Sequence, residues 1–440
     1  LALTMGVVDV QAQGTRASIS GTVVDEEGDP LPGANVIAVH EPSGTQYGAS
    51  SQSNGRYNLR GLRVGGPYTV TASFVGYRSL EESDINLQLG QDLTLDFEMV
   101  PESAELEEVR VVGERSAVIS SDRTGASRNV SQEEIERLPT INRSLTDFAR
   151  LIPQSGGGNS IAGRQGRYNK IQVDGATLDD VFGLGDAVPG SQAGAQPISL
   201  DAIEEFNVDI APYDVRSSGF TGGQINAITK SGTNEFSGSL RTIYRDEEFT
   251  GDLDGVGTGE FQEQFYVGTL GGPIIEDKLF FFVTGEFRRQ SSPLDTQVGD
   301  LAGPNTFQVG SGTLESISES RGTSIGSTSE LLSEIQNIAQ TQYNFSPGGF
   351  SPLSQEQNNE KFLAKIDWNI TNNHRLTARH NYVNAGDDSG LGRGRDDFDF
   401  ANRQYVFNSV QNSSTLQLNS TIGDNMFNEA RVVYTRIRDE

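Results

Sequence analysis

The sequence predicts a mainly β chain in three parts: an N-terminal β-sandwich, an α+β domain, and the first strands of an antiparallel transmembrane β-barrel, which is incomplete. Short alternating strands between Gly and Pro turns occupy residues 17–101. Short amphipathic helices and Gly-rich loops occupy residues 121–229. Beyond residue 233 the strands lengthen to about ten residues with one apolar and one charged face, which suits a tilted bilayer crossing.

The composition excludes several classes of protein. Asp and Glu number 60 against 33 Lys and Arg, and the net charge of −27 argues against a nucleic-acid partner. There is no cysteine, which excludes disulfides, zinc-thiolate sites and a cysteine nucleophile. No apolar run reaches the roughly 18 residues of a transmembrane helix, and a β-barrel would not show such a run.

Residues 1–12 resemble the end of an export signal. The run LALTMGVVDVQA is apolar and ends in a small-residue pattern that is typical of a signal-peptide cleavage site. We therefore interpret residues 1–12 as a signal-peptide remnant, with an ordinary first strand as the alternative.

Residues 13–101 are expected to fold as the β-sandwich. Ile19, Gly21 and Val23 alternate with their neighbours, and Phe97 and Met99 share one face of a later strand. The runs ISGTVVDEEGDPLPGANV, SNGRYNL and YTVTASFVGY are similar to the carboxypeptidase-regulatory-like domain, a structural and interaction module. No His-Glu zinc motif accompanies them, so the resemblance does not imply peptidase activity.

Residues 102–118 form an acidic linker that contains a short β-prone run, Val109, Arg110, Val111, Val112 and Gly113. A run this short cannot fold alone, but it can add itself as a strand to the open sheet edge of a partner. The alternative is a last strand of the sandwich.

Residues 119–232 are expected to form the α+β domain. Ser131 and Glu134 make a capping box for one helix, and Leu145 and Phe148 share the apolar face of a second helix. A strand then ends in an Asp-Gly turn within the motif Val173, Asp174 and Gly175. LPTINRSLTDFARLIP, IQVDGA and IEEFNV resemble, in this order, the plug motifs of TonB-dependent outer-membrane receptors, in particular the Oar-like branch.

Residues 233–440 are expected to supply about seven barrel strands and the loops that extend outward. Short connections at 272–278 and 371–373 alternate with long ones at 246–260, 291–360 and 385–403, the longest with a helix capped by Ser327 and Glu330. A plugged transporter has about 22 strands, so this sheet would be truncated and open. A soluble sandwich shows the same alternation and is the alternative.

The alternation assigns side chains to the two faces of these strands. We expect the apolar face to meet lipid and the charged face to meet the plug. The lipid-facing set is Leu279, Phe281, Phe362, Ile366, Trp368, Leu376 and Tyr382, and the plug-facing set is Glu286, Arg288, Lys365, Asp367 and Arg379. Phe265 and Val267 alternate with Gln262 and Gln264, and the same rule places these two apolar side chains against lipid.

No catalytic or cofactor site is expected. His40, His374 and His380 fit no known catalytic order, and no metal or phosphate motif is complete. We interpret the isolated carboxylates as solvated loop residues rather than metal ligands. They are Asp179, Asp180, Asp186, Asp252, Asp254, Asp396, Asp397 and Asp399.

The resemblance implies a receptor or transporter rather than an enzyme, in the outer membrane with a periplasmic N-terminal domain. Its implied partners are a TonB-like energy-transducing protein that pulls on residues 109–113, outer-membrane lipid, and an extracellular ligand such as a peptide, a carbohydrate or a metal chelate. A surface adhesion or structural protein that binds through the sandwich and the acidic loops is the alternative.

Overall fold

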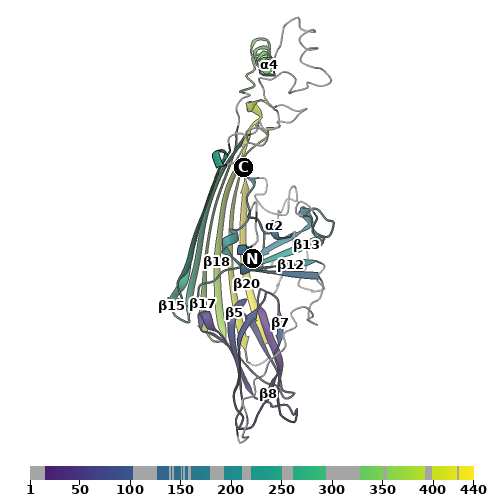
Figure 1. Ribbon diagram of the computed structural model, residues 1–440, viewed down its shortest axis with the longest axis vertical. Helices are drawn as coiled ribbons and strands as arrows, with labels where there is room; N and C mark the ends of the chain where they lie inside the picture. The colour runs from purple at the N-terminus through teal and green to yellow at the C-terminus, as the bar shows by residue number, and fades with distance from the viewer. Residues whose placement is uncertain are drawn as a thin grey trace, which may run out of the picture.

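The computed structural model confirms the mainly β class and arranges the chain as three β units: the N-terminal unit lies at one end of the long axis, and the middle unit lies beside the large sheet of the third (Figure 1). It describes residues 15–102, 126–137, 140, 143–149, 151, 154–156, 160–178, 193–210, 220–249, 261–293, 328–349, 354–391, 399–423 and 426–440. The expected signal remnant and the run 109–113 lie outside the described residues. None of the described helices is both long and apolar enough to span a membrane.

The N-terminal unit is a sandwich of two four-stranded sheets at the lower end of Figure 1. Strand β1 (Ala17–Asp25) pairs with β4 (Arg56–Leu62), β7 (Asp92–Thr94) and β8 (Phe97–Met99). The other sheet has the order β3 (Thr45–Ser50), β2 (Asn35–His40), β5 (Gly65–Ser73) and β6 (Leu80–Leu87), with the 3-10 turn η1 (Glu41–Ser43) after β2. Alternate residues such as Ile19, Tyr68 and Met99 are fully buried between the sheets because side chains along a strand alternate in direction.

The middle unit, which we call the plug, is a mixed five-stranded sheet with short helices. Its strands in spatial order are β11 (Ala176–Thr177), β10 (Lys170–Val173), β13 (Gly223–Thr229), β12 (Ile203–Ile210) and β9 (Ala126–Ser131). Its short helical segments are α1 (Gln132–Arg137), α2 (Leu145–Ala149), η2 (Gly166–Tyr168) and η4 (Leu200–Ala202). The expected capping box is present, since the Ser131 N–H donates to Glu134 Oε2 (3.3 Å) and the Glu134 N–H donates to Ser131 Oγ (3.4 Å).

The third unit, the barrel sheet, contains seven antiparallel strands, each paired with the next strand along the chain. They are β14 (Ser237–Asp246), β15 (Gln262–Ile275), β16 (Leu279–Pro293), β17 (Ser354–Thr371), β18 (His374–Ser389), β19 (Tyr405–Ile422) and β20 (Met426–Asp439). Short connections lie at the sandwich end. The opposite end carries η5 (Glu247–Phe249), α4 (Thr328–Tyr343) and η7 (Ala401–Arg403) (Figure 1). The expected strand number and the alternation of connection lengths are confirmed.

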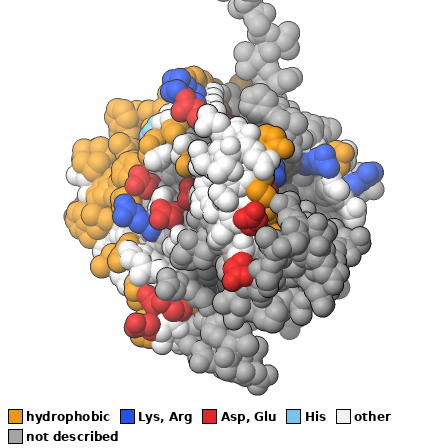
Figure 2. Space-filling view, turned by 90° about the horizontal axis from the view of Figure 1, so that it is seen from above, with side chains coloured by type: hydrophobic (Ala, Val, Ile, Leu, Met, Phe, Trp, Pro, Cys, Tyr) orange, Lys and Arg blue, Asp and Glu red, His pale blue; other side chains and the backbone are white. Residues whose placement is uncertain are grey.

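The two faces of the barrel sheet carry the expected side chains. Phe362, Ile366 and Trp368 are 45–47% exposed, whereas Lys365 and Arg379 are buried on the plug side. Leu279, Phe281, Leu376 and Tyr382 lie on the outer face, and Glu286, Asp367 and the half-buried Arg288 lie on the inner face. Figure 2 shows hydrophobic side chains gathered along one side of the molecule, where this sheet forms the wall. No second sheet among the described residues covers this apolar surface, as expected for a sheet that faces lipid.

Strand β15 corrects one expectation. Phe265 and Val267 are each only 2% exposed and face the plug, whereas Tyr266 and Leu270, each 47% exposed, form the outer face. The alternation of side chains along β15 is confirmed, but the predicted direction of Phe265 and Val267, toward lipid, is wrong. A plug fills this part of the interior, so an inward apolar residue packs against protein instead of meeting water.

Candidate functional site

The contact between plug and barrel sheet is built around the turn that joins β10 to β11. Asp174 (φ 48°) and Gly175 (φ 72°) both have positive φ, the geometry in which an Asp-Gly pair closes a two-residue hairpin. The Asp174 N–H donates to the carbonyl of Ala227 on β13 (2.9 Å). These two constraints fix the direction in which the Asp174 carboxylate points.

The Asp174 carboxylate accepts hydrogen bonds from both units. Its Oδ1 accepts the Thr229 N–H (2.9 Å), and its Oδ2 accepts the Thr229 hydroxyl (2.7 Å) and Arg379 Nη1 from β18 (2.9 Å). Burial acts to raise the pKa of Asp174, but the charges of Lys365 and Arg379 and the bonds from Thr229 outweigh it and lower the pKa to about 2. The group is therefore ionised throughout the physiological pH range.

Three barrel strands supply cations to this one region of the plug. Arg379 from β18 also donates to Thr415 Oγ1 (3.2 Å), and its side chain is 1% exposed. Lys365 from β17 donates to the Thr229 carbonyl (2.9 Å), and Arg431 from β20 donates to the Gly175 carbonyl (3.4 Å). The plug is thus held by directional polar contacts to strands that are distant in sequence.

A second set of contacts lies nearer the end that carries the long connections. Ser199 Oγ donates to Glu286 Oε2 (2.5 Å), and the same carboxylate pairs with Lys361 Nζ (2.6 Å). Asn381 Nδ2 donates to the Pro197 carbonyl (2.8 Å). All four of these side chains are buried, and the charges of Glu286 and Lys361 compensate each other.

A cavity of about 290 Å³ lies between the plug and the barrel sheet beside these contacts. Its walls carry Arg143 from the plug and Arg245, Arg288 and Lys361 from the barrel strands. The Arg143 guanidinium lies over the Phe265 ring (5.2 Å to the centroid) and pairs with Asp201 (2.5 Å). Arg288 pairs with Glu263 (2.8 Å), so the described cationic side chains of the cavity are paired with carboxylates of the protein itself.

The plug and the barrel sheet also share an apolar core. Phe282 and Leu363 from β16 and β17 pack into the buried cluster of the plug, which contains Phe148, Phe206 and Ile225. A small sheet with a hydrophobic face must bury it, and here the inner face of the barrel sheet provides the cover.

Comparison with known proteins agrees with this architecture. The model of the carboxypeptidase regulatory-like domain matches residues 18–100, and that of an outer membrane beta barrel domain matches residues 228–440. The TonB-dependent transporter Oar of Myxococcus xanthus is 30% identical over 293 residues, covering 60% of this chain and 26% of that protein. These matches support a TonB-dependent receptor of the outer membrane with an N-terminal regulatory-like domain.

Two further proteins are similar to this chain at lower identity. The TonB-dependent receptor SusC of Bacteroides thetaiotaomicron is 25% identical over 251 residues, covering 53% of this chain and 23% of that protein. The solved ferric enterobactin receptor PfeA aligns at a TM-score of 0.49 and 16% identity, covering 72% of this chain and 42% of that chain. The present chain therefore spans only about a quarter of the length of these two curated relatives.

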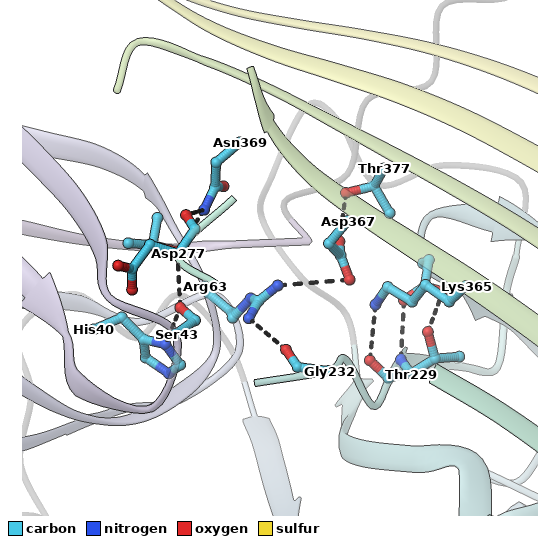
Figure 3. A network of polar contacts seen from close by, with 12 residues as sticks. His40, Ser43, Arg63, Thr229, Gly232, Asp277, Lys365, Asp367, Asn369 and Thr377 are labelled. Carbon is cyan, nitrogen blue, oxygen red and sulfur yellow. Dashed lines mark hydrogen bonds and ion pairs between the residues drawn. The ribbon is translucent and has the colours of Figure 1, made fainter. Parts of the chain in front are cut away.

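The receptor has a further contact surface, between the sandwich and the other two units (Figure 3). Arg63 of the sandwich donates to the Gly232 carbonyl (3.3 Å) and lies 3.5 Å from Asp367 Oδ2 on β17. In the other direction, the Arg375 guanidinium of β18 lies 3.8 Å from the ring centroid of Tyr47. Nothing in the local sequence around Arg63 or Arg375 indicated these contacts, because they join residues more than 160 positions apart.

The candidate residues from the sequence fall in different places. Val173, Asp174 and Gly175 lie together at the contact between plug and barrel sheet. The three histidines do not come together: His40 is buried and bonds to Ser43, while His374 and His380 bond to serines of β19. Burial and the Arg63 charge lower the pKa of His40 to about 3, so it is neutral.

Proposed function

We propose that this receptor imports a scarce or large ligand across the outer membrane, and that a TonB-like periplasmic protein supplies the energy. The observation that carries the proposal is the polar attachment of the plug to a membrane-facing sheet, centred on Asp174 and Arg379. Water can replace such hydrogen bonds and ion pairs when the plug moves, whereas a wholly apolar contact would expose bare hydrophobic surface. The attachment can thus hold the plug against the barrel sheet and be exchanged for contacts with water when the plug moves.

The proposal assigns a task to each part of the chain. Residues 1–12 are a signal remnant, 13–101 a periplasmic sandwich, 102–118 the coupling linker, 119–232 the plug, and 233–440 barrel strands with outward loops. The run Val109 to Gly113 adds itself as a strand to the energising partner, and the turn Val173 to Gly175 anchors the plug to the wall. The ligand is a peptide, a carbohydrate or a metal chelate, and the chain performs no catalysis.

The coupling role can be tested by capture of the full-length receptor on the purified periplasmic domain of its TonB-like partner. Val111→Pro removes a backbone donor that strand addition needs, so we expect capture to fall by about tenfold or more. Ser116→Pro, which introduces the same residue outside the run, should leave capture unchanged. Equal capture of both variants would remove residues 109–113 as the coupling strand.

The transport role has a separate test. Cells with and without the energising partner are supplied with candidate peptides, oligosaccharides and ferric chelates, and accumulation inside the outer membrane is measured. Accumulation that needs the partner supports import. Surface binding that is equal in both strains, with no accumulation, would show an adhesin instead.

A further inference from the structure

The sandwich is attached to the rim of the barrel sheet and to the chain that enters it. Besides Gly232 and Asp367, Arg63 lies beside the ring of Phe280 on β16 (5.8 Å to the centroid). Gly232 belongs to the connection between the last plug strand and the first barrel strand. One side chain of the sandwich thus touches the barrel wall and the connection from plug to barrel (Figure 3).

The rim reaches back to the sandwich through strands β17 and β18. Arg375 Nη2 donates to the Gln46 carbonyl (2.5 Å), and Asn369 Nδ2 donates to Thr45 Oγ1 (2.9 Å). The Asn234 N–H, just before β14, donates to the Pro42 carbonyl (2.8 Å). The sandwich residues in these contacts all lie on β3 or in the loop that leads into it, which therefore forms the docking edge of the sandwich.

The underside of the plug completes the contact. Val64 and Leu89 of the sandwich bury a small apolar cluster with Ile228 of β13. Glu205 on β12 accepts the Leu89 N–H at its Oε1 (3.0 Å). The sandwich therefore contacts strands β12 and β13 of the plug sheet on the side away from the long connections (Figure 1).

The character of this contact is that of a reversible docking surface. The sandwich and the plug keep separate hydrophobic cores, and among the described residues they are joined by one small cluster of three buried apolar side chains. The other contacts named above are hydrogen bonds, one ion pair at 3.5 Å and cation–π contacts, and the ring of Phe427 on β20 also lies against Gly61. Inter-domain contacts that are polar and contain little apolar area allow relative motion by default.

We propose that the sandwich is a releasable cap on the periplasmic side of the plug, latched by Arg63 and Arg375, and that it leaves the rim when the plug is displaced. This inference rests on the proposed energy-coupled transport. The position of the coupling run supports it: Val109 lies ten residues beyond Met99, the end of strand β8, and Ala126 of the plug lies thirteen residues beyond Gly113. A pull on this run therefore acts on the sandwich and on the plug together.

The test uses the absence of cysteine from these 440 residues, and any cysteine in the rest of the full-length receptor is first replaced by serine. Single cysteines are placed in the full-length receptor in cells, and their reaction with a membrane-impermeant maleimide, admitted to the periplasm, is timed. Val64→Cys reports the docking surface because Val64 is 5% exposed, and Val75→Cys is the control because Val75 is 93% exposed. Ser199→Cys reports the plug against the barrel wall, since Ser199 is 2% exposed beside Glu286.

In cells treated with a protonophore, we expect Val64→Cys to react at least about tenfold more slowly than Val75→Cys, as a buried site that opens rarely does. In energised cells the reaction at Val64 should speed up together with that at Ser199. Arg63→Gln should release the cap even in protonophore-treated cells and so speed up the labelling of Val64→Cys. Arg56→Gln, which changes an exposed arginine of β4, should not. Assembly in the outer membrane is checked for every variant.

Three results would overturn the cap. The first is equal labelling of Val64→Cys and Val75→Cys in protonophore-treated cells, which would show that no docked state exists. The second is exposure of Ser199→Cys on energising while Val64→Cys stays protected, which would leave transport intact but remove release. The third is protection of both cysteines in energised cells, which would remove the coupling as well as the cap.

Discussion

Arg379 in the barrel wall and Asp174 in the plug form an ion pair whose Nη1 and Oδ2 atoms lie 2.9 Å apart, with the arginine side chain 1% exposed. Removal of one partner from such a buried pair leaves the other charge without compensation, which costs about 3–5 kcal/mol. The pair is therefore a sensitive point in the attachment of the plug.

Asp174→Asn should loosen the plug. Asn tolerates the positive φ of 48° at this position, so the substitution removes the charge without straining the backbone. We expect proteolysis of the plug in the assembled receptor to become faster than in the native protein. Asp84→Asn is the matched control, because Asp84 also has a positive φ (59°) but lies exposed on the sandwich. Equal protection of the two variants would contradict a structural role for the pair.

Gly175→Ala should destabilise the plug more than Gly163→Ala. Both glycines have positive φ (72° and 73°), so each alanine carries a left-handed strain of about 1–2 kcal/mol. Only at Gly175 would the new Cβ meet a neighbour, 1.8 Å from Arg431 Nη1, whereas nothing lies within 4 Å at Gly163. Thermal unfolding of both variants measures the difference. An equal loss of stability would show that Arg431 moves aside without cost.

The local features of this site were readable in the sequence, and the long-range ones were not. The Asp-Gly pair predicted the turn, and strict alternation placed Lys365 and Arg379 on the plug-facing side. The pairing of Gly175 with Arg431, 256 positions away, depends on how the seven strands curve around the plug. The predicted orientation of Phe265 was wrong because alternation defines the two faces of a strand but does not determine which face meets the plug.

Docking of the sandwich should weaken as the pH rises through about 7. Burial raises the pKa of Glu205 to about 7, and the charges of Glu204 and Glu134 add to the rise against the hydrogen bonds from Leu89 and Asn129. A raised pKa in the docked state means that the protonated form is favoured there. The stabilisation of the docked state by protonated Glu205 is complete below the ordinary pKa of 4.5, and it is lost as the pH rises past 7.

The pH dependence is measured as labelling of Val64→Cys relative to Val75→Cys in the purified receptor between pH 5.5 and 8.5. The ratio should change by at most about tenfold per pH unit in the native background, because one proton is involved. Glu205→Gln keeps an acceptor for the Leu89 N–H without a charge and should remove the dependence. Glu81→Gln, an exposed control on β6, should keep it. A dependence that survives in Glu205→Gln would assign it to another group.

Residues 15–102 should fold without the rest of the receptor. Their apolar core runs from Ala17 to Met99 and contains no residue of the plug or the barrel sheet. We expect dispersed amide NMR signals and one cooperative unfolding transition. Met99→Ala should cost about 2–5 kcal/mol because the side chain is fully buried, and Val75→Ala should cost almost nothing. A disordered spectrum of the native fragment would show that the docking surface is needed for folding.

Ile366→Arg should impair assembly into the membrane. Ile366 is 45% exposed on the outer face of β17, between Phe362 and Trp368, in the surface that the fold presents to lipid. An arginine on the lipid face costs about 2–4 kcal/mol near the bilayer midplane. The heat-modifiable band on cold electrophoresis measures the folded fraction. Val75→Arg, on the exposed sandwich loop, is the control and should assemble normally. Normal assembly of Ile366→Arg would place this position in the polar interface instead, and the apolar belt would then have to lie nearer to Phe362.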